Sequence, residues 1–315
     1  QKTGYDITNQ FDDTDINLYA GTSDQKIIYL SRNDWVETYP SPVSLSCINS
    51  TFIADMQYGK GVVAKEEDKM PLRETVTYVN DSGALEELKL ISLMDYAYED
   101  PIWQDLLNQL TWKDMQRLCT YGAGSLPGAE SVHAPGGKAK DGPAGIQYTN
   151  PNLGVNMGFP NEIVMASTFN VDLINAAGDA FGMEIMHVGF TMIYGPGANM
   201  HRSPYGGRNF EYYSEDSYLA SQMFTHQCKG LTDRGIIVCA KHFALNEQEQ
   251  FRYGVATFAN EQTIREIYIK AFEDGIVDGN ANAVMSSFNR LGATWAGRHS
   301  GLLTEVLRKE WGFTG

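Results

Sequence analysis

A lysine and a histidine stand side by side where a buried strand is expected to end. Residues 235–240, GIIVCA, form a short, apolar and β-branched run of the kind that buried strands show. Lys241 and His242 follow directly. A lone histidine at such a point is ordinarily a structural residue bonded to the backbone, but a lysine beside it weakens that interpretation. Two hydrogen-bond donors here suit a polyhydroxylated ligand, provided that the chain bends so that both reach one site.

Three other segments carry polar or aromatic side chains near predicted strand ends. Asp141 lies in KDGPAGIQ, residues 140–147, which is also compatible with a simple surface turn. Residues 195–221, GPGANMHRSPYGGRNFEYYSEDSYLAS, are glycine-rich, aromatic and too long for a tight turn, which favours a functional loop. In VMSSFNRLG, residues 284–292, Met285 and Phe288 could form a wall of a sugar site, although core packing explains either one equally well.

Strand and helix patterns alternate after residue 101. The strand-like runs are 141–146, 162–166, 190–194, 236–240 and 283–287, and the helical segments are 171–187, 215–232 and 261–277. Ser300 is expected to cap a further helix that Gly312 ends. This alternation predicts an α/β fold with parallel strands, of the (β/α)8 barrel type, whose active sites lie at the carboxyl ends of the strands. No GxGxxG follows a strand, so the dinucleotide-binding alternative has no support.

The first hundred residues have a different character. They hold short strand-like pieces, at 26–30 and 74–79, between polar stretches and without helix–strand alternation. We therefore predict a division into residues 1–100 and residues 101–315. The final EWGFTG, residues 310–315, reads as a helix end before a sixth strand, so about five strands of an incomplete barrel are expected in this chain.

Composition narrows the class of partner and cofactor. The 315 residues carry a net charge of −15 without basic runs, which argues against nucleic acid and anionic membranes and is neutral toward sugars. The four cysteines are scattered without a CxxC pair, so neither a zinc site nor a disulfide framework is expected, and no cofactor is predicted. No membrane span or signal peptide is visible. This weakly favours a cytoplasmic location, but a chain that starts at Gln1 leaves a removed leader or an upstream segment open.

Four motifs, in this order and at suitable spacing, closely resemble glycoside hydrolase family 3, the β-glucosidase group. They are DGPAG, YGPGANMHRSPYGGRNFEYYSEDS, KHFALNEQE and VMSSFNRLGATWAG with the following LLTEVLRKEWGFTG. The resemblance runs from about residue 110 to residue 315. It implies a (β/α)8 barrel and hydrolysis of the terminal β-glucosyl residue of a carbohydrate, without metal or organic cofactor.

The resemblance also implies roles for individual residues. In the family, the Asp of DGP grips hydroxyls of the first sugar, and an Arg in the GGRN segment and the Lys-His pair bind the same sugar. An Arg shortly after Lys-His often joins them, and a Met and a Tyr line the pocket; Phe stands here in place of the Tyr and lacks its hydroxyl. The implied sugar-binding residues are Asp141, Arg208, Lys241, His242, Arg252, Met285 and Phe288.

Neither catalytic carboxylate is expected within the chain. In the family the nucleophilic Asp follows the WGF-x-G segment, which places it just after Gly315, and the acid/base Glu comes from a sandwich domain. Residues 27–42, IIYLSRNDWVETYPSP, resemble part of that α/β sandwich, here placed before the barrel, and Glu37 is a distant candidate for the acid/base. Glu211 is expected to orient the site, and Glu247 and Glu249 to lie behind it or at the surface. The remainder of the enzyme, or a companion chain, would complete the barrel.

Several alternatives stay open. A β-xylosidase or β-galactosidase of the same family fits the sequence equally, and a non-catalytic sugar-binding fragment is an alternative from another class. The β-N-acetylhexosaminidase branch carries a catalytic His in the loop after Lys-His. The loop ALNEQEQFR, residues 244–252, contains no His, which counts against that branch.

Overall fold

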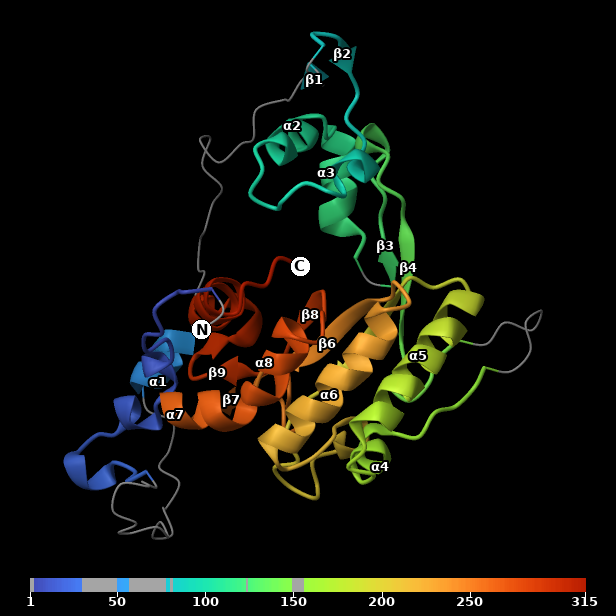
Figure 1. The fold of residues 1–315 in the computed structure, drawn as a ribbon. Helices are drawn as coiled ribbons and strands as arrows, with labels where there is room; N and C mark the ends of the chain where they lie inside the picture. Colours follow the sequence, from blue (N-terminus) through green and yellow to red (C-terminus); the bar gives the residue numbers. More distant parts are fainter. Residues whose placement is uncertain (1–2, 30–49, 57–77, 80–81, 123, 149–155) are drawn as a thin grey trace.

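A strongly curled five-stranded sheet forms the centre of the molecule (Figure 1). The structure is a computed structural model that describes residues 3–29, 50–56, 78–79, 82–122, 124–148 and 156–315. In spatial order the strands are β3 (Ser125–Leu126), β4 (Gly137–Asp141), β5 (Met192–Gly197), β6 (Ile237–Phe243) and β8 (Ala283–Ser286). β3 pairs antiparallel with β4, whereas the other neighbours are parallel. The sheet is half of a barrel, as the alternating sequence pattern predicts.

Helices cover the outer face of this half-barrel, as crossover connections between parallel strands require (Figure 1). They are α4 (Glu162–Ala166), α5 (Val171–His187), α6 (Ser217–Thr232), α7 (Glu261–Thr263), the π-helical η8 (Ile264–Tyr268) and α8 (Lys270–Val277). Helix α6 packs against α5 on one side and against α8 on the other. The predicted helices 171–187, 215–232 and 261–277 are thereby confirmed, the last with a π-helical interruption.

The two faces of the sheet have different neighbours. On β6, Val238 and Ala240 belong to the main core together with Phe224 of α6 and Phe272 of α8. Cys239 belongs instead to a smaller cluster on the concave face, with Ala139 and Met192. Because side chains alternate along a strand, Lys241 shares the face of Cys239, and Asp141 shares that of Ala139. The charged ends of β4 and β6 therefore lie on the concave face of the half-barrel.

A second, smaller assembly precedes the barrel and lies beyond the β3–β4 ladder (Figure 1). It contains the hairpin of β1 (Tyr78–Val79) and β2 (Leu85–Glu86), the 3-10 turns η5 (Leu90–Leu93) and η6 (Glu130–Val132), and the helices α2 (Ile102–Asn108) and α3 (Trp112–Thr120). Leu88, Leu93, Leu106, Ala129 and Val132 form its own buried core. The predicted division at residue 100 stays a prediction.

A short strand that precedes β8 and the segment that follows β8 together build a small sheet, and that segment ends in a terminal helix. β7 (Ala256–Thr257) pairs parallel with β9 (Arg290–Leu291), which pairs antiparallel with β10 (Thr294–Trp295). The turn η9 (Ala296–Arg298) leads into the π-helix η10 (Gly301–Glu310). The remaining elements are the 3-10 turns η1 (Asp12–Thr14), η2 (Ile16–Tyr19), η3 (Ser23–Gln25) and η7 (Asn209–Glu211), and helix α1 (Ser50–Met56).

Residues 3–14, which we call the N-terminal strap, fasten α7 to η10. The Thr14 hydroxyl donates to the Ala259 carbonyl at 2.7 Å, and the Phe11 ring stacks on His299 with centroids 5.5 Å apart. The Tyr5 hydroxyl donates to Glu305 of η10 at 2.7 Å. Phe11 and Thr14 are almost completely buried. The strap is therefore an integral layer of the fold.

Two local predictions are wrong, and a third is only partly confirmed. Residues 162–166 form helix α4, because the Asn161 side chain accepts a hydrogen bond from the Val164 amide and caps a helical turn. The described part of 26–30, residues 26–29, contains no strand. Ser300 lies at the N-cap of η10, as predicted, but its side chain makes no capping hydrogen bond; Nδ1 of the preceding His299 accepts from the Leu302 amide at 3.0 Å.

Other predictions shift or fall partly outside the described residues. The strand predicted at 141–146 is wrong except for Asp141: β4 spans 137–141 and ends at that residue, because Gly142 and Pro143 break it. Gly312 follows the end of η10 with φ of +72°, as a helix stop requires. Of the piece predicted at 74–79, only β1 lies among the described residues, and most of the predicted sandwich segment, Glu37 included, lies outside them. Within the described residues, no helix has the length and apolar character to cross a membrane.

Candidate functional site

Lys241 is the centre of the candidate site. Its side chain is 2% exposed, and its ammonium lies 3.3 Å from Oδ1 of Asp141 and 3.4 Å from Oε2 of Glu211. Glu211 is equally buried, whereas the Asp141 side chain is 52% exposed. A buried cation is tolerated only when it is paired, so these two carboxylates account for the position of Lys241. The more exposed Asp141 is the member of this group that a ligand reaches first.

The register of the sheet brings these groups together. Asp141 is the last residue of β4, and Lys241 of β6 pairs with Met285 of β8. The carboxyl ends of parallel strands meet at one edge of the sheet. Lys241 and Met285 therefore come close to Asp141, although they lie 100 and 144 positions after it in the chain. The half-buried Met285 side chain packs against the concave-face cluster of Ala139, Met192 and Cys239.

Alternating charges continue from Glu211 to the loop after β6. Arg208 forms a close ion pair with Glu211, and its guanidinium lies 3.9 Å from Oε1 of Glu249. Nη1 of Arg252 donates to Oε2 of Glu249 at 2.7 Å. The Arg252 guanidinium in turn lies 4.9 Å from the centroid of the Phe288 ring. One chain of contacts thus links Asp141, Lys241, Arg208, Arg252 and Phe288 through two glutamates.

His242 is held as a neutral imidazole at the edge of the same group. Its Nδ1 lies 3.2 Å from the Tyr212 hydroxyl, and Asn199 binds its backbone on both sides, at 2.8 Å from N and 3.0 Å from O. Burial, together with the charges of Arg208, Lys241 and Arg252, lowers the pKa of His242 to about 2. When the phenol donates to Nδ1, Nε2 carries the proton and is the donor left for a ligand.

The backbone leaves regular strand geometry between these two residues. The β6–β8 register shifts between Lys241 and Phe243, and the peptide bonds Lys241–His242 and Phe243–Ala244 are both cis. Lys241 and His242 are both buried, at 2% and 3% exposure. Both side chains can serve one site only if the chain bends here, and the shift in register lies at that position.

Several buried polar residues of the site were not singled out in the sequence. Glu162, the first residue of α4, is completely buried, and neither of its carboxylate oxygens has a partner among the described residues. Burial raises the pKa of Glu162 well above its usual range, and the charge of Glu211 adds to the effect. Tyr212 and Asn199 hold His242. Only Tyr212 had a signal, since it lies in the aromatic loop beside Arg208.

Glu247 and Glu249 have different surroundings. Glu249 accepts from Asn246 at 3.2 Å and lies between Arg208 and Arg252. Glu247 is turned toward Asn199 and the Met200 amide, each at 3.4 Å, and burial raises its pKa to about 7. Both glutamates line a neighbouring pocket of about 640 Å³. The expectation that they lie behind the sugar contacts stays a prediction.

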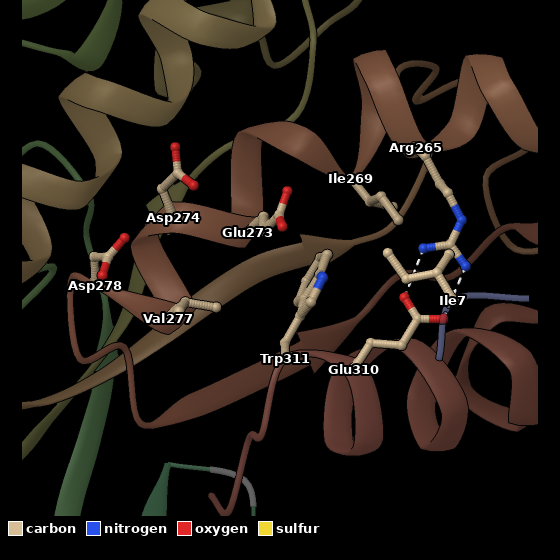
Figure 2. A pocket seen from close by; sticks show the side chains of 9 residues that line it. All are labelled: Ile7, Arg265, Ile269, Glu273, Asp274, Val277, Asp278, Glu310 and Trp311. Atoms are coloured by element: carbon tan, nitrogen blue, oxygen red, sulfur yellow. Dashed lines mark hydrogen bonds and ion pairs between the residues drawn. The ribbon is translucent and has the colours of Figure 1, made fainter. Parts of the chain in front are cut away.

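A further pocket, of about 380 Å³, lies between α8, η10 and the strap (Figure 2). Figure 2 shows Arg265 paired with Glu310 on one side and Glu273, Asp274 and Asp278 on the other. This pocket contains none of the predicted sugar-binding residues. Nowhere in the described ranges do three or more His, Cys, Asp or Glu side chains form a group that could hold a metal ion.

Comparison with known proteins gives one consistent result. Residues 151–315 match the glycosyl hydrolase family 3 N-terminal domain. The chain is 40% identical over 197 residues to β-glucosidase A of Butyrivibrio fibrisolvens, covering 62% of this chain and 23% of that protein. Among the curated relatives it matches, the chain spans at most about a third of their length.

Solved structures agree. The chain resembles β-glucosidase 3B of Thermotoga neapolitana in complex with glucose, with a TM-score of 0.59 and 39% identity over 61% of this chain and 28% of that one. It also resembles a β-glucosidase of Paenibacillus barengoltzii, with a TM-score of 0.65 and 31% identity over 78% and 27% of the two chains. The half-barrel therefore corresponds to part of a (β/α)8 barrel.

Proposed function

Because the chain belongs to glycosyl hydrolase family 3, we propose that it forms the first-sugar subsite of a retaining exo-β-glycosidase, specifically a β-glucosidase. β-Glucosidases stand among its relatives, and one similar structure was solved with glucose. The substrate would be a β-glucoside or β-linked oligosaccharide, of which the non-reducing terminal glucosyl residue is removed.

The observation that carries the proposal is the row of alternating charges from Asp141 through Lys241 and Glu211 to Arg208. A sugar hydroxyl both donates and accepts, so it can bind a carboxylate and a cation at the same time. The charges already compensate one another, so the group can hold a neutral ligand without a counter-ion. Asp141 would accept from two hydroxyls, and Lys241, Arg208 and Nε2 of His242 would donate.

The remaining predicted residues would shape the rim. Met285 and Phe288 would supply apolar surface beside the clamp, and Arg252 is held by Glu249 next to the Phe288 ring. The Tyr hydroxyl of the family is missing at Phe288, so any role for that hydroxyl beside the nucleophile does not transfer to this chain.

The chemistry would need groups that we do not assign to this chain. A retaining enzyme uses two carboxyl groups about 5–5.5 Å apart, one as nucleophile and one as acid/base, through a covalent glycosyl-enzyme intermediate. We place the nucleophile just after Gly315 and leave the acid/base to the sandwich domain. The 315-residue chain alone is then expected to bind sugar without turning it over.

The test combines intact mass with hydrolysis of p-nitrophenyl β-D-glucoside, β-D-xyloside and β-D-galactoside. Mass is measured on protein purified from its source, and the same assays are run on the 315-residue chain. A mass well above 35.0 kDa with turnover of the glucoside supports the proposal. Turnover by the 315-residue chain alone would contradict our placement of the nucleophile, and would direct attention to Glu247, Glu249 and Glu37.

Two measurements separate the remaining alternatives: the relative turnover of the three substrates, and calorimetric titration with D-glucose. Preferential turnover of the xyloside or galactoside would identify another specificity of the same family. Glucose binding that persists in a longer, inactive protein would favour a sugar-binding role without catalysis.

A further inference from the structure

A pocket of about 750 Å³ lies between helix α3 and the β3–β4 ladder, away from the sugar clamp. Its basic lining residues are Lys113 and Arg117 of α3 and Lys138 of β4. Lys138 is the second residue of β4, whereas Asp141 of the clamp is the last, so about 10 Å of strand separates them. The pocket and the clamp are therefore two separate places.

The charge of this pocket is opposite to that of the chain. Asp and Glu outnumber Lys and Arg by 39 to 24 in the sequence. Among the described residues that line the pocket, three are basic and none is acidic. Exposed charges are screened within about 8 Å at physiological ionic strength, so the distant acidic residues have little effect here. The pocket therefore suits an anionic ligand.

A carboxylate of the chain itself already lies between two of these cations. Oε2 of Glu130 is 3.8 Å from Nζ of Lys113, and its Oε1 is 3.7 Å from Nη1 of Arg117. Both separations are too long for hydrogen bonds, and the Glu130 side chain is 77% exposed. Lys113 and Arg117 thus converge on one carboxylate that they hold only loosely. An external carboxylate can compete with Glu130 for both cations.

The two cations are held in place from behind by Asp114. Its Oδ1 accepts from the Glu130 amide at 3.1 Å, and its Oδ2 accepts from the Ser131 hydroxyl at 2.6 Å. Burial acts to raise the pKa of Asp114, but the hydrogen bonds from Ser131, Thr111 and the Glu130 amide outweigh it and lower the pKa to about 2. Helix α3 is thereby fixed against η6, so a ligand meets cations whose backbone needs no reordering.

The rest of the lining suits a hydroxylated ring. Tyr121, at the C-cap of α3, is 63% exposed and offers an aromatic face. Gly128, Gly136 and Gly137 also line the pocket, and they present peptide groups instead of side chains. Peptide groups and a phenol donate and accept hydrogen bonds, as sugar hydroxyls do. A small inorganic anion would leave Tyr121 and most of the volume unused.

We propose that this pocket is a second carbohydrate site, which binds the carboxylate groups of an acidic oligosaccharide built from uronic acids. Lys113, Arg117 and Lys138 pair with its carboxylates, and Tyr121 packs against a sugar ring. The inference goes beyond the proposed function and does not depend on it, because it needs no sugar in the clamp. A phosphate or a polycarboxylate without a sugar ring is the competing occupant.

The test is calorimetric titration of the 315-residue chain with trigalacturonate, and with maltotriose as the neutral trisaccharide. Trigalacturonate is expected to bind about 10-fold more tightly at low salt, as a few exposed ion pairs allow. High salt should remove most of this difference, because the cations are open to solvent.

Three variants and a matched control locate the site. Arg117→Gln should weaken trigalacturonate binding about 3- to 5-fold, whereas Glu130→Gln should strengthen it about 2-fold, because the internal competitor is gone. Tyr121→Ala should weaken binding of trigalacturonate but not of citrate, which has no ring. The control is Arg234→Gln: Arg234 is 40% exposed and paired with Asp179, much as Arg117 is 38% exposed and paired with Glu130, and its loss should change nothing.

Each outcome decides the proposal. Equal affinity for trigalacturonate and maltotriose overturns it, and so does tighter binding of phosphate or citrate than of trigalacturonate. Equal losses in Arg117→Gln and Arg234→Gln would show attraction to the whole surface instead of a site. D-glucose titration tests the clamp separately, and its failure would leave this pocket untouched. Melting temperatures show whether a loss in Arg117→Gln arises from unfolding, and the gain expected for Glu130→Gln cannot arise in that way.

Discussion

At the scale of single residues, the candidate site is a problem of buried charge. Lys241 and Glu211 are both almost fully removed from water, and each is acceptable only because it is paired, with the other and with Asp141 or Arg208. The exposed Asp141 adds a second acceptor that can move toward a ligand. A change at Lys241 should therefore affect stability as well as sugar binding.

Lys241→Met is expected to destabilise the chain by about 3 kcal/mol, because it removes one of the two cations, Lys241 and Arg208, that pair with the buried Glu211 carboxylate. Urea denaturation measures this loss. Adding Glu211→Gln should recover part of it, since the uncompensated charge is then removed. Lys113→Met, at a 70% exposed lysine, is the matched control and should change stability by less than about 0.5 kcal/mol. Equal losses for both lysines would contradict this account.

His242 predicts a pH dependence of stability. Its folded-state pKa is lowered to about 2 from 6.5, so it stays neutral in the folded chain while the unfolded chain takes up a proton below about pH 6.5. Stability attributable to this residue is therefore lost as the pH falls below 6.5, by about 1.4 kcal/mol per pH unit.

The measurement is the denaturation free energy at pH 6.5 and pH 5. His242→Gln should lose about 2 kcal/mol less than the unchanged chain over this interval, since the replacement does not titrate. His187→Gln, at an exposed histidine in the last turn of α5, should follow the unchanged chain. Parallel curves for all three proteins would show that His242 is protonated when folded.

The site was partly predictable at this scale. Lys241 and His242 follow the strand pattern of 235–240, so their place at one edge of the parallel sheet was predictable, whereas Asp141 was expected at the start of a strand and lies at the end of β4. Glu162 could not be found, since its burial depends on how α4 packs against the turn that carries Glu211. The same holds for Asn199, because its bonds to His242 join positions 43 residues apart.

At the scale of elements, two glycines set the distance between α5 and α6. A Cβ at Gly230 would lie 2.2 Å from the Asn175 carbonyl oxygen, and one at Gly178 would lie 2.6 Å from that of Gln227. Both obstacles are backbone atoms, which cannot rotate away. The helices can therefore approach closely only with glycine at both positions, despite its cost inside a helix.

Gly230→Ala is expected to destabilise the chain by about 1–2 kcal/mol, because the steric cost of overpacking exceeds the gain in helix propensity. Thermal denaturation followed by circular dichroism measures the effect. Gly158→Ala has open space and no positive φ, so it should be neutral or slightly stabilising. A stable Gly230→Ala variant would mean that α5 and α6 can separate without loss.

Long periodic elements were predictable, and short ones were not. Helix 171–187 was predicted with its observed ends from its apolar pattern, and in the structure the Asn170 side chain caps it by accepting from the Leu173 amide. EIVMA at 162–166 has the composition of a strand, but Asn161 and burial of Met165 and Ala166 make it a helix. Five residues carry too little periodic signal to outweigh one capping bond.

At the scale of the whole molecule, the strap joins distant parts of the sequence. The Thr3 hydroxyl donates to the Glu310 carbonyl, 307 positions away, and Arg265 donates to the Thr8 carbonyl. The amides of Gln10 and Phe11 both donate to Glu261 of α7, at 3.0 and 2.9 Å. Nothing in the sequence pattern predicted these contacts, since residues 3–14 form little regular structure.

Phe11→Ala should destabilise the chain by about 3–5 kcal/mol, because the buried ring leaves a cavity against His299. Hydrogen exchange should then rise in α7 and η10 before it rises in α5. Ile7→Ala, at a 57% exposed residue of the same strap, should have little effect. Unchanged protection of η10 in Phe11→Ala would show that the strap does not secure that helix.

The strap also constrains the order in which the molecule can assemble during synthesis. Residues 3–14 are synthesised about 290 residues before their partners at 299–310. At about 5–20 residues per second, that interval lasts roughly 15–60 s. Throughout it, the Phe11 ring lacks His299, on which it stacks in the folded chain. This segment should therefore remain a site for chaperone binding until residues 299–310 have been made.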